Sequence, residues 1–256
     1  MPRECAFCPA TANLSAEHVF SEWMDRLFPG KKYFHNFRAT KSWASDTLDF
    51  KARVVCEKCN NTWMSNIESQ HAKPSMTDLM VGKQNVPISQ SRAHSIALFA
   101  FKTAVIMDHV NPSRHIHFFS RKVRYRFRET RDIPPNVMMW MAGHLDAKHG
   151  GCFSIYHNGQ YGPADIHLYV CNYVVGHLAF QVVAEQGATF LALSPKPGYE
   201  NLAVGFWPTV PNGLVWPLKS VLKSTREFRD FGQRWSKLTI TVPGGGLRHK
   251  YLSVAL

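Results

Sequence analysis

The chain has 256 residues, of which 45% are hydrophobic, so it is neither disordered nor fibrous and can bury the core of one large or two small domains. It contains no run of about 18 apolar residues and its first residues lack the apolar segment of a secretory signal, so we expect no membrane span and a cytoplasmic protein. The net charge of +12 favours a polyanionic partner, either nucleic acid or anionic lipid, with a basic protein that has no such partner as the alternative.

Two C-x2-C pairs are the strongest motif in the sequence. Cys5 and Cys8 form the first pair, and Cys56 and Cys59 form the second, 47 residues later. Each spacing lets the backbone fold into a knuckle with both sulfurs on one side, so four thiolates can surround one Zn²⁺. The alternative is four unrelated buried thiols, and a redox role would need only one pair. The other two cysteines, Cys152 and Cys171, stand in apolar segments and are interpreted as core residues.

Short elements are expected around these pairs, in the order in which the chain reaches them. They are a helix over 21–28 with Ser21 as its N-cap, a strand over 50–55 that leads into Cys56, and a helix over 60–68 with Asn60 at its N-cap or in its first turn.

These features resemble the HNH endonuclease family, in the branch whose ββα-metal finger is held by a four-cysteine zinc site. The family pattern is a C-x2-C pair, an acid-His or His-His pair, and a second C-x2-C followed by Asn or His at the start of a helix. The matching residues are Cys5/Cys8, Glu17-His18 and Cys56/Cys59-Asn60. The resemblance covers residues 5–70, about a quarter of the chain.

The resemblance implies a role for each residue of the acid-His pair and for the residue after the second knuckle. His18 would activate water as the general base, and Glu17 would hold a divalent ion, Mg²⁺ or Mn²⁺, on the scissile phosphate. Asn60 would be a further ligand of that ion. Without the resemblance, His18 is a histidine beside a helix, Glu17 an acid near a helix start, and Asn60 an N-cap.

The sequence departs from the family pattern at three positions, one of which is Ser21, where the family commonly has a Pro soon after the His. Met64 stands where the family often has a second ligand on the helix, and a thioether is a poor ligand for a hard ion. Lys51 stands where the family places a central Asn, with Asp49 as a candidate substitute. Asn61 and Glu68 are outer candidates for supporting roles, and Trp63 and Ile67 are expected in the core.

Residues 72–89 are expected to be a connector, followed by a helix over 91–109 whose apolar residues recur at helical spacing. Lys102 interrupts the apolar stretch of this helix. We interpret it as a surface lysine whose stem covers apolar neighbours, with a phosphate contact as the alternative.

The segment Arg121–Glu129 alternates cations with apolar residues. This pattern predicts a strand with four cations on one face, spaced to follow a phosphate backbone; an ordinary solvated face is the alternative. The four cations are Lys122, Arg124, Arg126 and Arg128.

The rest of the chain predicts an antiparallel sheet, a basic amphipathic helix and a last strand. The expected strands cover 137–142, 153–157, 166–175 and 177–184, the helix runs from Pro217 to about Trp235, and the last strand is Leu238–Val242. The predicted fold is therefore α+β, with a zinc-stabilised ββα-metal domain over 1–82 and a mixed domain with an antiparallel sheet over 83–256.

Two functions compete on this evidence. The first is a metal-dependent HNH-type endonuclease that hydrolyses DNA, with RNA and a homodimer left open. The second is a zinc-containing nucleic-acid-binding protein without catalysis, which Met64 and the missing central Asn favour. A zinc-dependent deaminase is discounted because four cysteines close the zinc site and the H-x-E signature is missing. A membrane-surface role has only the helix after Pro217 as a weak candidate.

Overall fold

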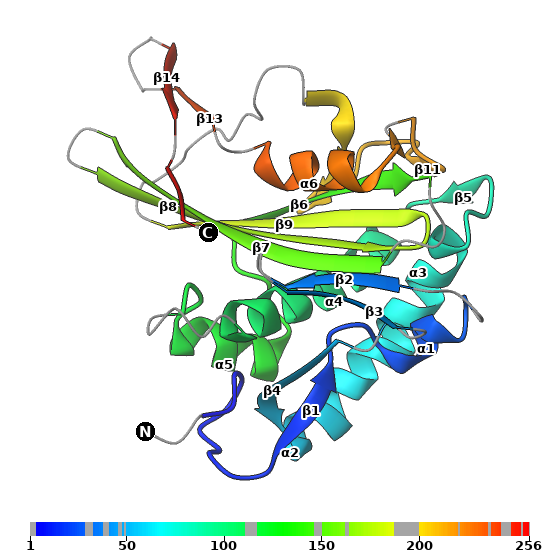
Figure 1. Ribbon diagram of the computed structural model, residues 1–256, viewed down its shortest axis with the longest axis vertical. Coiled ribbons are helices and arrows are strands. Elements are labelled where there is room, and N and C mark those ends of the chain that lie inside the picture. Colours follow the sequence, from blue (N-terminus) through cyan, green and yellow to red (C-terminus); the bar gives the residue numbers. More distant parts are fainter. Residues whose placement is uncertain are drawn as a thin grey trace.

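The computed structural model shows a mixed α+β fold, which confirms the predicted class (Figure 1). It describes residues 4–28, 33–37, 41–45, 48, 50–110, 117–145, 150–161, 164–186, 200–219, 221–234, 237–241, 247–251 and 253–255. Asp49 and Trp235 are outside this part of the chain, as is Val242. In the part that is described, no helix combines the length and the apolar character needed to cross a bilayer.

The N-terminal quarter is built from two antiparallel strands and a long helical run. Strand β4 (Lys51–Cys56) corresponds to the strand predicted before Cys56, and it pairs with β1 (Leu14–His18). The short helix α1 (Glu22–Asp25) and a two-stranded sheet of β2 (Tyr33–Phe37) and β3 (Lys41–Ser45) lie between them in sequence. Ser21 occupies the predicted N-cap position of α1, although its side chain makes no capping hydrogen bond.

The helical run that follows β4 is longer than the sequence indicated. Its consecutive parts are α2 (Glu57–Cys59), the π-helical segments η2 (Asn60–Met64) and η3 (Ile67–Ala72), and α3 (Lys73–Met80). The prediction of a connector over 72–89 is therefore wrong for residues 72–80. Pro74 lacks the N–H that the interior of an α-helix needs, but it lies in the first turn of α3, directly after the wider π-helical turns of η3. Gly82, with φ of 75°, follows the end of the run.

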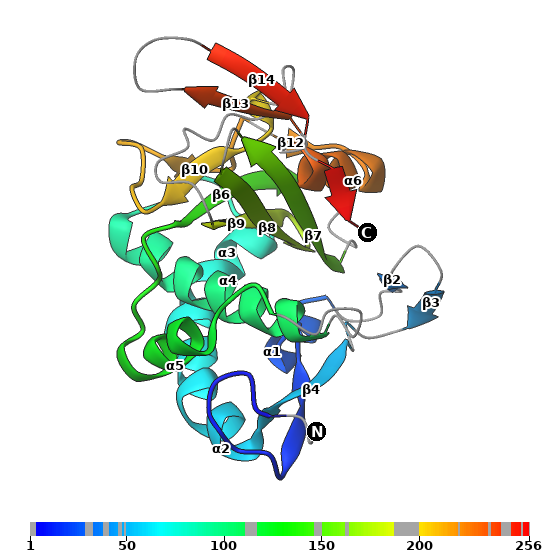
Figure 2. The ribbon, with the colours of Figure 1, turned by 90° about the vertical axis from the view of Figure 1, so that its left-hand side faces the viewer.

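Helix α4 (Gln90–Val110) lies at the centre of the molecule and matches the predicted helix over 91–109. It packs against the η3 segment on one side and against strands β7, β9 and β10 on another. Figure 2 shows it between the N-terminal elements and the large sheet. Its side chains from Ile96 to Met107 are buried on every side of the helix. They belong to a hydrophobic core that contains residues of both predicted domains, 1–82 and 83–256.

The large sheet is antiparallel along its main path, as predicted. Its strand order is β10-β6-β9-β8-β7-β15, and β12 pairs with β6 in parallel. The strands are β6 (Val137–His144), β7 (Gly150–Tyr161), β8 (Ala164–Val175), β9 (Leu178–Gln186), β10 (Val204–Trp207), β12 (Val221–Leu222) and β15 (Ser253–Ala255). Helix α4 lies on one face and α6 on the other, which explains why the strands are apolar on both faces (Figure 1).

The C-terminal part differs from the prediction in the extent of its helix. Helix α6 (Thr225–Gln233) begins after Ser224, whose Oγ accepts from the Glu227 N–H, so the described residues 217–219 and 221–224 of the predicted helix are not helical. The remaining short elements are β5 (Val86–Pro87), η4 (Glu200–Leu202), β11 (Val215–Trp216), β13 (Lys237–Thr241) and β14 (Leu247–Tyr251). Strand β13 agrees with the predicted last strand, except that β14 and β15 follow it.

The basic segment 121–129 is a helix, which corrects the predicted strand. Helix α5 (Arg121–Thr130) begins after Ser120, whose Oγ accepts from the Val123 N–H, and it ends at Arg131 with a φ of 63°. Capping at both ends and the helical propensity of arginine outweigh the alternation of cationic and apolar residues. The four cations therefore do not share one face.

Candidate functional site

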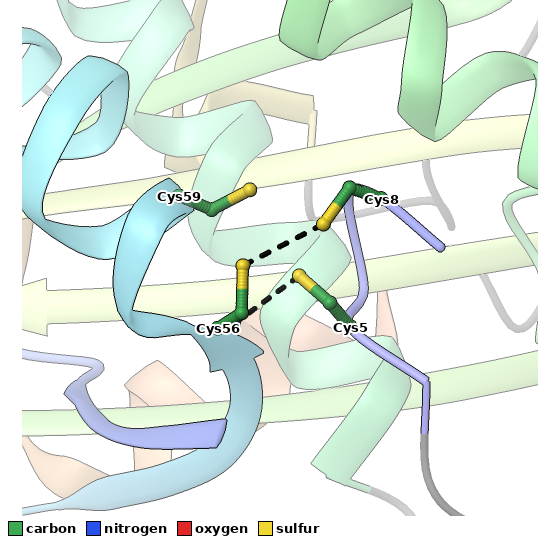
Figure 3. Close-up of side chains that lie close together, drawn as sticks. All are labelled: Cys5, Cys8, Cys56 and Cys59. Carbon is green, nitrogen blue, oxygen red and sulfur yellow. Dashed lines mark hydrogen bonds between the residues drawn. The ribbon is translucent and has the colours of Figure 1, made fainter. Parts of the chain in front are cut away.

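The four cysteines of the two C-x2-C pairs come together into one cluster. Cys5 and Cys8 lie on the N-terminal loop, Cys56 ends β4, and Cys59 lies in α2 (Figure 3). Their sulfur atoms all lie within 4.8 Å of one another, with 3.5 Å between the Sγ atoms of Cys8 and Cys56. All four side chains are buried. The sequence prediction that these residues converge is confirmed.

The geometry and chemistry of this cluster fit a structural zinc ion. Four thiolates at a Zn–S distance of about 2.3 Å lie about 3.8 Å apart, close to the spacing observed here. The backbone N–H groups of Phe7 and Cys56 donate to the Cys5 sulfur at 3.5 and 3.3 Å. The hydrogen bond from the Cys59 thiol is the largest influence on Cys5 and, together with these N–H groups, lowers the pKa of Cys5 to about 5. The same hydrogen bond raises the pKa of Cys59, and burial raises the pKa of Cys8, so of these three cysteines only Cys5 favours the thiolate without a metal ion. Four protein ligands leave no open position, so such a site is structural.

Helix α5 is attached to the first knuckle, and this contact removes one predicted phosphate ligand. Arg124 is buried and donates from Nη1 to the Ala6 carbonyl and from Nε to the Phe119 carbonyl, the latter at 3.0 Å. Phe127, from the same helix, packs against Phe7 and Trp63 beside the cysteines, with ring centroids 6.4 and 5.8 Å away. Arg124 therefore stabilises the fold of the knuckle and does not face a ligand.

The other three cations of α5 differ in their surroundings. Lys122 is exposed, Arg126 forms an exposed ion pair with Asp132 at 3.0 Å, and Arg128 is half-buried. Their role in nucleic-acid binding stays a prediction.

The predicted acid-His pair lies on β1 with its two side chains in different environments. The side chain of His18 is 27% exposed and its Nε2 lies 3.8 Å from a Glu22 carboxylate oxygen in α1. The Glu17 side chain is 4% exposed and belongs to the interior. Successive residues of a strand point to opposite faces, which accounts for this difference.

Glu17 forms an ion pair with Lys102, a residue that the sequence analysis placed at the surface. The Lys102 Nζ donates to Glu17 Oε1 at 3.0 Å and to Glu68 Oε1 at 2.5 Å, and it lies 5.1 Å from the centroid of the Phe99 ring. The Lys102 side chain is completely buried, so both interpretations of it, as a surface lysine and as a phosphate contact, are wrong.

The electrostatics of this buried triad are set by competition between burial and pairing. Burial alone would lower the pKa of Lys102, but the carboxylates of Glu68 and Glu17 outweigh it and raise that pKa. Burial also raises the pKa of Glu17, an effect that Lys102 opposes and Glu68 reinforces. The ammonium therefore stays charged between two acids.

Asn60 lies beside β1 but makes a structural contact there. Its Nδ2 donates to Ser15 Oγ at 3.2 Å, and Ser15 Oγ donates to the Val55 carbonyl at 3.3 Å. The N-cap of the helix is Cys56, so the N-cap interpretation of Asn60 is wrong. Trp63 and Ile67 are buried, as predicted. Met64 is also buried, and Asn61 is exposed.

Two basic residues of β4 lie on the same outer face of the β1–β4 pair as His18. Lys51 is the cross-strand partner of His18, and Arg53 follows two positions later; both are exposed, whereas Ala52 and Val54 are buried. Directly paired residues have Cβ atoms about 5 Å apart, so Lys51 stands close to His18. The alternation of 51–54 could have revealed this face, but the sequence interpretation considered Lys51 only as a replacement for Asn.

A second group of metal-type ligands, Asp108, His109 and His117, was also missed, because the fold brings His117 to the adjacent residues Asp108 and His109. The two Asp108 oxygens accept hydrogen bonds from the N–H groups of Phe118 and Phe119, and one also accepts from Tyr156. The rings of His109 and His117 are stacked, with centroids 3.7 Å apart and 17° between the planes. Their in-plane lone pairs therefore run side by side, which does not suit coordination of one ion.

Comparison of the chain with protein-family models, with curated proteins and with solved structures finds no match.

Proposed function

We propose that the protein is an HNH-type endonuclease that hydrolyses DNA phosphodiester bonds, with His18 as the general base. The observation that supports this proposal best is the arrangement of β1, β4 and the helical run from Glu57, with the cysteine cluster at the β4–helix junction and His18 on β1. This is the order of elements that a ββα finger requires. RNA remains a second substrate to be tested.

His18 combines a fixed backbone with access to solvent. In the proposed reaction its imidazole accepts a proton from water and the resulting hydroxide attacks phosphorus. The bond to the 3′-oxygen then breaks, its electron pair stays on that oxygen, which takes a proton from solvent, and the products are a 5′-phosphate and a 3′-hydroxyl. Glu22, 3.8 Å from Nε2, would stabilise the imidazolium that forms. Lys51 and Arg53 would contact the backbone phosphates on the same face.

The divalent ion implied by the family resemblance receives less support from the residues present. Its expected ligand Glu17 is buried and paired with Lys102, and the Asn60 amide is hydrogen-bonded to Ser15. No described metal-ligand group contains Glu17 or His18. These residues do not fit the ion in the arrangement observed, so we assign it no step.

Cleavage of supercoiled plasmid tests the proposal. The zinc-loaded protein should nick or linearise the plasmid, and His18→Ala should abolish cleavage while binding in a mobility-shift assay is retained. His71→Ala is the matched control, because His71 lies in η3 and contacts Ser95 of α4 rather than the β1–β4 face. Each reaction is run with Mg²⁺, with Mn²⁺ and with EDTA, after which the ends of the products are mapped.

A zinc-containing nucleic-acid-binding protein without catalysis is the second candidate. The Glu17–Lys102 ion pair favours it, because the lysine occupies the acid that a nuclease of this type would use to bind its catalytic ion. Salt-sensitive DNA binding with no cleavage by the wild type or by His18→Ala would support this candidate over the nuclease.

A further inference from the structure

The ββα elements present two carboxylates toward one point in the interior. Glu17 comes from β1 and Glu68 from the helical run, and both reach the same atom, the Nζ of Lys102. A strand and a helix that each supply an oxygen ligand could hold a hard divalent ion between them. Here the cation between the carboxylates comes from α4, outside the finger.

The surroundings of Nζ suit a single ammonium group. The Lys102 side chain has no exposed surface, and its Nζ lies close to the Phe99 ring as well as to the two carboxylates. An aromatic face attracts a monovalent cation but offers no lone pair to a metal. A divalent ion such as Mg²⁺ would need oxygen ligands at about 2.1 Å and would retain several waters, for which a completely buried ammonium leaves no room.

We infer that Lys102 is the built-in cation of this site, so that Glu17 and Glu68 bind the ammonium of α4 instead of a divalent metal ion. This inference concerns the site of the proposed nuclease, but it depends on the ion pairs and not on cleavage. Lys102 is then a positioning residue: it holds the strand that carries His18 against the helix and against α4. The protein would use zinc for structure alone.

Binding of Mn²⁺ to the zinc-loaded protein tests the inference directly, because free Mn²⁺ is measured by its electron paramagnetic resonance signal. Wild type and Glu17→Gln should bind Mn²⁺ equally weakly. Lys102→Met removes the ammonium while keeping a similar stem, and it should gain one Mn²⁺ site at least tenfold tighter than any in the wild type. Lys102→Met/Glu17→Gln should lose that site, and Lys102→Arg should behave as the wild type.

Two results would overturn the inference. One is a wild-type Mn²⁺ site that Glu17→Gln abolishes, which would show that Lys102 gives way to the metal. The other is a folded Lys102→Met variant, verified by circular dichroism and zinc content, that gains no Mn²⁺ site. If Lys102→Met does not fold, the comparison of wild type with Glu17→Gln still decides the question. Because the readout is metal binding, failure of the nuclease proposal in the plasmid assay would leave this result unaffected.

Discussion

Removal of the buried lysine should destabilise the protein, and the loss should depend on pH. In Lys102→Met the Glu17 carboxylate keeps its buried position but loses its cation, while Glu68, with 22% of its side chain exposed, can turn to water. Removing one partner of a buried pair typically costs about 3–5 kcal/mol. Glu17 can limit this cost by taking up a proton.

The cost of that proton sets the size of the effect. Protonating a carboxyl group with an unfolded-state pKa of about 4.3 costs about 3.7 kcal/mol at pH 7.0 and about 1.6 kcal/mol at pH 5.5. The folded variant binds more protons than the unfolded chain between pH 4.3 and the raised pKa of Glu17, so its stability rises as the pH falls. We therefore expect a loss of about 3 kcal/mol at pH 7.0 that shrinks by about 2 kcal/mol at pH 5.5.

Urea denaturation of zinc-loaded protein at both pH values measures this effect as a difference from the wild type, so that the pH dependence of zinc binding largely cancels. The matched control is Lys102→Met/Glu17→Gln, which has no ionisable Glu17 and should show a smaller loss that is the same at both pH values. A loss below 1 kcal/mol at pH 7.0, or one that does not change at pH 5.5, would refute the reasoning.

Three other predictions concern separate parts of the molecule. Burial lowers the pKa of the completely buried His157 to about 4, so on acidification this histidine is protonated in the unfolded chain before it is protonated in the folded protein. The free energy of unfolding therefore falls as the pH falls, and His157→Leu should reduce this loss between pH 7.5 and pH 5 by about 2 kcal/mol. Equal pH dependence in the variant and the wild type would contradict this. Lys51→Ala should weaken DNA binding and reduce the slope of the logarithm of the DNA-binding constant against log salt concentration by about 1. The control Lys83→Ala, in the turn after α3, should leave the affinity and the slope unchanged. Equal effects of the two substitutions would argue against a phosphate-binding β1–β4 face. Cys56→Ser should reduce bound zinc, measured by mass spectrometry, from one ion per chain to a weakly held fraction, and it should lower the melting temperature. The control Cys152→Ser should retain the zinc. Full zinc retention by Cys56→Ser would exclude the four-sulfur site.

The parts of the fold that the sequence predicted well are those with strong local signals. The C-x2-C spacings, the apolar periodicity of α4 and the strand-like apolar runs separated by Gly-containing turns each indicate one local structure. The sheet, α4 and the cysteine cluster were accordingly expected. The segment 121–129 failed because its alternating pattern suits a strand, while Ser120 and the propensity of arginine, which favour a helix, received no weight.

The candidate site was only partly predictable because its decisive contact links residues far apart in the chain. Glu17 and Lys102 are 85 positions apart, and no local pattern indicates that a lysine in an apolar helix has an acid as its partner. A lysine surrounded by buried residues on every side does suggest a partner, since burying an unpaired charge is costly. That argument could have placed Lys102 inside, but it could not have identified Glu17 or Glu68.

The wide separation of the two cysteine knuckles has a consequence for the order in which the protein forms. A ligand set divided by 47 residues requires a loop closure whose entropic cost grows as ln n, about 3.4 kcal/mol at this length apart from a constant. During synthesis Cys5 and Cys8 emerge well before their partners, and β1 must also wait for β4. The first C-x2-C pair therefore stays incomplete until the second pair has been synthesised. A zinc ion bound to all four sulfurs would then close the intervening chain into one ring.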